Sequence, residues 1–94
     1  MKLREVAEKV RSKNAGPFWL TIDIFCGSAE AFAQVKGLET DRVSQLFQRE
    51  AKRFELPDLH VIKFSIPRPA IQGTREDRDM HGASFAEILA DLDI

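Results

Sequence analysis

The sequence predicts a small α+β domain in which helices cover one face of a sheet. Two segments, 18–26 and 59–66, alternate apolar and polar residues in the way that β-strands do. A third, weaker strand is expected at 53–56, and helical patterns lie between and after these segments. Because strands and helices interleave within one short chain, the expected architecture is a two-layer sandwich with a mixed or antiparallel sheet.

The strand at 18–26 has the clearest pattern. Its alternation places one set of side chains on each face: Leu20, Ile22, Ile24 and Cys26 on one, and Trp19, Thr21, Asp23 and Phe25 on the other. In 59–66 the same alternation groups His60, Ile62, Phe64 and Ile66 on one face, with Leu59, Val61, Lys63 and Ser65 opposite. Pro67 and Pro69 end this strand because proline donates no ladder hydrogen bond.

Helices are expected at both ends of the chain and between the strands. Apolar residues at three- and four-residue spacing in 3–10 indicate a short amphipathic helix, although a short edge strand also fits. Ser28 is placed to cap a helix that ends at a left-handed Gly37. Thr40 or Asp41 caps the next helix, and the capping-box spacing of 84–87 predicts a C-terminal one.

Composition indicates one ordinary globular domain over residues 1–94. Of the 94 residues, 44% are hydrophobic and 31% charged, and the net charge is -1. No basic run provides the stripe that nucleic-acid binding requires, and no apolar run approaches the roughly 20 residues of a membrane span. The single cysteine, Cys26, cannot form an internal disulfide, which favours a reducing, cytoplasmic location.

The stretch Arg11 to Phe18 predicts an anion-binding turn directly before the first strand. Arginine offers a planar fork, lysine a mobile charge, and an Asn/Gly turn directs backbone amides at an oxyanion. The candidate ligand-binding residues here are Arg11, Ser12, Lys13, Asn14 and Gly16. The alternative is that the charges are merely solvated and that Gly16 and Pro17 serve the geometry of a tight turn.

A second polar stretch, 67–82, is too long for a simple connector and is a candidate for function. Arg68 lies between two prolines, and this restriction lowers the entropy lost when an anion binds. Arg68 is therefore the second candidate cation, and the two loops are candidates for one shared site. If the face that carries Asp23 is not exposed, this carboxylate needs a donor, for which a loop Arg or Lys is suited.

The same stretch contains candidates for catalysis. Asp77, Asp79 and His81 alternate and have ligand chemistry that suits zinc or manganese, but they match no specific metal motif. Asp79 and His81 alternatively form an acid/base pair, and hydrogen-bonded loop closure is the structural explanation. No bound metal or other cofactor is expected, and Cys26 lacks an evident activating base.

Arg11 to Phe18 followed by Leu20 to Ile24, together with Ser65 to Pro69, resembles a family of short bacterial proteins catalogued as a domain of unknown function. These are similar to the small C-terminal domain associated with the acyclic terpene utilisation protein AtuA. In that domain an Arg-Ser-Gly-Asp-Lys-Gly turn stands where Arg11 to Gly16 stands here. The resemblance implies a ferredoxin-like fold and a small accessory subunit of a large AtuA-like protein, active in organic-acid or acyl-CoA catabolism.

The leading hypothesis is that Arg11, Lys13 and Arg68 bind a carboxylate or a CoA phosphate at the interface with that larger subunit. One alternative is a self-contained enzyme that uses Asp79 and His81, with or without a metal. Another is a purely structural interaction module. Homo-oligomerisation is also consistent with the sequence, because a small sheet has edges that need cover.

Overall fold

The computed structural model describes residues 1–68 and 84–94. Its sheet contains β1 (Lys9–Asn14), β2 (Trp19–Phe25), β3 (Lys52–Leu56) and β4 (Val61–Pro67). All neighbouring strands are antiparallel, in the order β1-β2-β4-β3. The helices are α1 (Leu3–Val6), α2 (Ala29–Lys36), α3 (Thr40–Phe47) and α4 (Ser84–Ala90), and a short 3-10 helix, η1 (Pro57–Leu59), joins β3 to β4.

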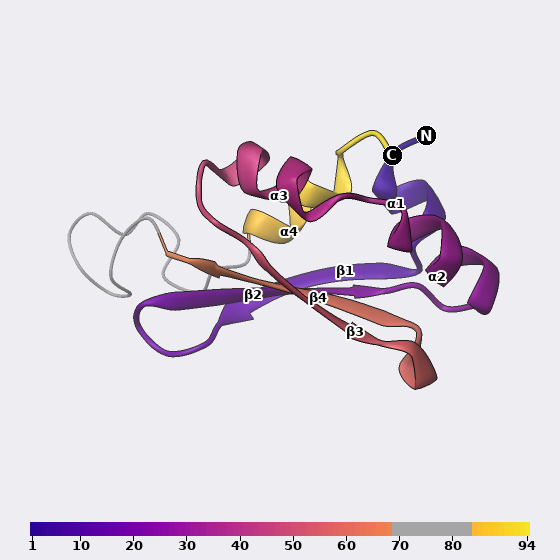
Figure 1. Ribbon diagram of the computed structural model, residues 1–94, viewed down its shortest axis with the longest axis horizontal. Coiled ribbons are helices and arrows are strands. Elements are labelled where there is room, and N and C mark those ends of the chain that lie inside the picture. Colours follow the sequence, from indigo (N-terminus) through magenta and orange to yellow (C-terminus); the bar gives the residue numbers. More distant parts are fainter. Residues whose placement is uncertain (69–83) are drawn as a thin grey trace.

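The four helices form one layer and the sheet forms the other (Figure 1). This confirms the predicted α+β two-layer sandwich, which is consistent with a ferredoxin-like architecture. The sheet is built from two hairpins, β1-β2 and β3-β4, whose second strands pair with each other. Among the described residues, helices cover only one face of the sheet (Figure 1).

The core lies between the two layers. The central strands contribute a set of side chains with no solvent exposure: Leu20, Ile22, Ile24, Ile62, Phe64 and Ile66. Val35 of α2, Val43 of α3 and Leu89 of α4 pack against this set and are equally buried. The alternation read in 18–26 and 59–66 therefore identified the buried face of both central strands correctly.

The N-terminal segment differs from the helix predicted for residues 3–10. Helix α1 ends at Val6, and the chain is already in β1 at Lys9. Along β1 exposed and half-buried residues alternate, and the whole strand pairs with β2. A backbone ladder over six residues outweighs the helical spacing of the few apolar side chains, so the edge-strand alternative is correct from Lys9 onward.

The helix limits were predicted in part. The Ser28 hydroxyl accepts a hydrogen bond from the Ala31 amide at 3.1 Å, which confirms Ser28 as the N-cap of α2. Gly37 ends α2 in a right-handed conformation, with φ -70°, so the expected left-handed stop is wrong. The N-cap of α3 is Glu39, and Thr40 is the first helical residue.

His60 does not belong to a strand. It follows η1 in the left-handed conformation, with φ 53°, and β4 begins at the next residue. The backbone turns here because the chain must reverse direction between β3 and β4. The strands predicted at 53–56 and 59–66 are otherwise confirmed, with β3 beginning at Lys52 and β4 at Val61.

Arg53 ties β3 to the helical layer. Its guanidinium donates to the backbone carbonyls of Leu38 and Lys36, the latter at 2.7 Å, and to the Glu55 carboxylate at 2.9 Å. Only 15% of the Arg53 side chain is exposed, and its bond to the Leu38 carbonyl is partly buried. They hold the connection between α2 and α3 against the edge of the sheet.

Candidate functional site

The face of the sheet opposite the helices, here called the open face, carries two of the three cations predicted from sequence, Arg11 and Lys13. Its residues follow from the register of the strands. Two rows of cross-strand neighbours run over it: Arg11, Asp23, Lys63 and Phe54, and Lys13, Thr21, Ser65 and Lys52. Residues from distant parts of the chain thus meet on one continuous surface.

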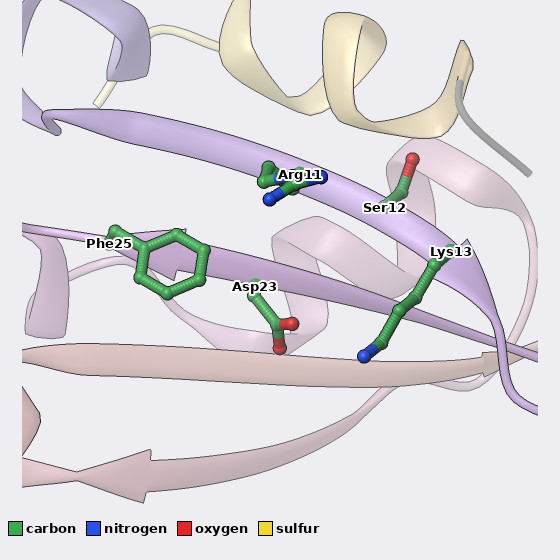
Figure 2. Close-up of a pocket in the computed structure, with 5 residues that line it drawn as sticks. All are labelled: Arg11, Ser12, Lys13, Asp23 and Phe25. Atoms are coloured by element: carbon green, nitrogen blue, oxygen red, sulfur yellow. The ribbon is translucent and has the colours of Figure 1, made fainter.

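A cavity of about 180 Å³ opens on this face beside β1 and β2 (Figure 2). It is lined by Arg11, Ser12, Lys13, Asp23 and Phe25. In Figure 2 the side chains of Lys13, Asp23 and Phe25 extend away from α4, whereas Ser12 points toward it. The cavity therefore combines a cationic wall from β1 with a carboxylate and an aromatic ring from β2.

Asp23 lines this cavity from β2, and most of its side chain is buried. Its side chain is 15% exposed, and Lys63 Nζ lies 3.8 Å from Oδ1, which is ion-pair distance without a hydrogen bond. Asp23 Oδ1 and the neighbouring Thr21 hydroxyl are both buried without a hydrogen-bond partner in the described part of the chain. Buried polar atoms are nearly always paired in proteins, so two unpaired ones side by side are unusual.

Half of the segment predicted as an anion-binding turn, Arg11 to Phe18, belongs to a strand. Arg11 to Asn14 belong to β1, and only residues 15–18 connect β1 to β2. Gly16 lies in this hairpin loop with φ +82°, a left-handed conformation that glycine adopts without strain. The expectation that Arg11 to Asn14 form a turn is therefore wrong, and Arg11 and Lys13 instead project from a strand. Anion binding by these two cations stays a prediction.

The structure separates the predicted ligand-binding residues. Alternation along β1 sends Arg11 and Lys13 to the open face, and Ser12 and Asn14 to the helical side. The Ser12 hydroxyl accepts a hydrogen bond from the Ala86 amide of α4 at 2.9 Å. Asn14 Oδ1 accepts from the Arg68 guanidinium.

Arg68 itself is 8% exposed, and its amide donates to the Phe18 carbonyl at 2.9 Å. It therefore joins the hairpin loop to the end of β4 on the helical side. Arg68 does not line the cavity that holds Arg11 and Lys13. It contacts Asn14 and the backbone of Phe18 instead.

Cys26 does not line this cavity. Asp77, Asp79 and His81 lie outside the described residues. Within residues 1–68 and 84–94 no group of three or more His, Cys, Asp or Glu is placed to hold a metal ion. Cys26 is buried, and this burial raises the pKa of its thiol, which lowers the fraction of reactive thiolate.

Exposed apolar side chains lie on the same open face. Trp19, Phe54 and Leu56 are 40%, 51% and 41% exposed. The Lys52 ammonium lies 5.8 Å from the centre of the Trp19 ring, a cation-π distance. Sequence reasoning did not single out these residues or Lys63, because their common face depends on pairing between strands far apart in sequence.

No described helix has the length and apolar character needed to cross a membrane. Neither the curated proteins nor the solved structures include a significant match to the chain. One family model does match, and it covers residues 3–93. Since this match spans nearly the whole sequence, the chain belongs to the DUF4387 family, a domain of unknown function.

Proposed function

We propose that this protein is a small accessory subunit that binds an anion through Arg11 and Lys13 and docks through its open face on a larger protein. The anion is a carboxylate or the phosphate of a CoA-type ligand. The observation that carries the proposal is the open face itself, where a cationic cavity adjoins exposed apolar side chains. The resemblance to AtuA-like proteins suggests a large AtuA-like subunit as the partner and organic-acid or acyl-CoA catabolism as the context.

The anion-binding part rests on the chemistry of the two cations. Arg11 and Lys13 are exposed, project to the same face and have no ion-pair partner among the described residues. A guanidinium binds a carboxylate or phosphate through two parallel hydrogen bonds, and a nearby ammonium adds a mobile charge. The strand fixes the backbone of both residues, so little backbone entropy is lost when an anion binds.

The docking part rests on the apolar and charged groups of the open face. Exposed Trp19, Phe54 and Leu56 give it an apolar component. Among the paired strand residues of this face, cations outnumber the carboxylate of Asp23; the cations are Lys9, Arg11, Lys13, Lys52 and Lys63. Two copies packed face to face would bring like charges together, whereas an acidic surface of a different protein complements them.

A purely structural interaction module is the second candidate, and the exposed apolar strip favours it. In that case the cations only match acidic residues of the partner. Variants of Arg11 and Lys13 would then weaken assembly without changing the affinity for any small anion. An enzyme that uses Asp79 and His81 would depend on residues outside the described part of the chain.

The anion site is tested by titrating acetate and phosphate into ¹⁵N-labelled protein and following amide shifts by NMR. We expect shifts in β1 and β2, and a loss of affinity of about tenfold or more in the Arg11→Ala/Lys13→Ala double variant. The matched control is Lys36→Ala/Arg49→Ala, which removes the same charge from an exposed position of α2 and one between α3 and β3. Equal weakening by both pairs would indicate a nonspecific charge effect and contradict the proposed site.

A further inference from the structure

The cavity is not purely cationic. Asp23 stands directly opposite Arg11 across β1 and β2, and Thr21 stands directly opposite Lys13. A plain anion bound to Arg11 and Lys13 would lie beside the carboxylate of Asp23 and be repelled by it. A site built only for a plain anion has no use for this carboxylate.

We propose that the ligand of this cavity is a small carboxylic acid with a hydrogen-bond donor, hydroxyl or ammonium, on the carbon next to its carboxylate. This inference rests on the proposed anion site and specifies its ligand class. The ligand carboxylate binds Arg11 and Lys13, and its donor faces Asp23. The apolar remainder of the ligand lies toward Phe25, which lines the same cavity.

The spacing of the strands suits such a molecule. Directly opposed residues of an antiparallel pair have their Cβ atoms about 5 Å apart. The basic and acidic sides of the cavity are therefore close enough for adjacent groups of one small molecule. The cavity volume of about 180 Å³ is small, which fits a ligand of few heavy atoms.

Asp23 retains the capacity to accept a further hydrogen bond. Lys63 forms an ion pair with it at 3.8 Å but makes no hydrogen bond to Oδ1. An ionised carboxylate has about four lone-pair sites, so a ligand donor adds to the Lys63 contact without replacing it.

Propionate, lactate and alanine provide the test, because they share a three-carbon carboxylate skeleton and differ in the substituent next to the carboxylate. Each is titrated into wild-type protein and the dissociation constant is taken from amide shifts of β1 and β2. We expect lactate or alanine to bind at least about tenfold more tightly than propionate, the effect of one hydrogen bond to a charged acceptor. The tighter of the two identifies the donor as hydroxyl or ammonium.

The variant Asp23→Asn separates recognition from a structural effect. Removing this charge should tighten propionate binding and weaken alanine binding, whereas general damage to the cavity would weaken both. Glu39→Gln is the control, because it makes the same charge change at an exposed position between α2 and α3.

Three results would overturn the inference. Equal affinity of wild-type protein for all three acids would refute the ligand class while leaving the anion site in place. The same direction of change for propionate and alanine in Asp23→Asn would assign Asp23 a structural role. No binding of any of the acids would refute both the ligand class and the anion site.

Discussion

Replacing Thr21 by valine should stabilise the protein. The Thr21 hydroxyl is buried without a hydrogen-bond partner in the described structure, and such burial costs about 1–3 kcal/mol. Valine keeps the branched shape and has a high strand propensity, so the substitution removes the cost without opening a cavity. We expect an increase of about 1 kcal/mol in the free energy of unfolding, which for a domain of this size raises Tm by about 4–8 °C.

The measurement is urea unfolding of wild-type and variant protein, with the midpoint compared at equal m-value. Ser12→Ala supplies a control of opposite sign. The Ser12 hydroxyl is paired with the Ala86 amide at 2.9 Å, so its loss should destabilise the protein by about 1 kcal/mol. Destabilisation by Thr21→Val of 1 kcal/mol or more would show that the hydroxyl has a structural partner, and would refute the reasoning.

Two further predictions concern the frame that holds the open face. Arg53→Met should lower the free energy of unfolding by about 2–3 kcal/mol in urea unfolding, because the carbonyls and the carboxylate that Arg53 binds lose charged donors; an unchanged midpoint would contradict its bridging role. Gly27→Ala should cost about 1–3 kcal/mol, since Gly27 has φ +88° and an added Cβ would lie 2.7 Å from Glu8 Oε2. Gly37→Ala, at an ordinary right-handed φ, is the control and should change Tm less than Gly27→Ala.

The fold was predictable where the relevant information is local. In 18–26 the alternation is a property of consecutive residues, and it identified Leu20, Ile22 and Ile24 as buried. The strand β1 was harder to predict from the sequence because its apolar spacing also suits a helix. Its pairing with β2 decided the outcome, and that contact is not visible in the segment itself.

The candidate site was predictable in composition but not in arrangement. Arg11 and Lys13 could be nominated from their chemistry, and Asp23 from its place on a strand. Their common cavity depends on the β1-β2 register, which the sequence does not display. Arg68 was grouped with them because both stretches are polar, yet it lies at the end of β4 and bonds to Asn14 on the helical side.

The most direct test of the account is whether the open face holds a larger partner. Tagged wild-type protein and a Phe54→Ser/Leu56→Ser variant are purified in parallel from native cells, and co-purifying proteins are identified and quantified by mass spectrometry. Ile88→Ser, which alters an exposed apolar side chain of α4, is the control.

We expect one large protein, AtuA-like and near stoichiometric, with wild-type protein and with Ile88→Ser, and its loss with the open-face variant. Recovery of no such protein with the wild type, or its full retention by the open-face variant, would contradict the account.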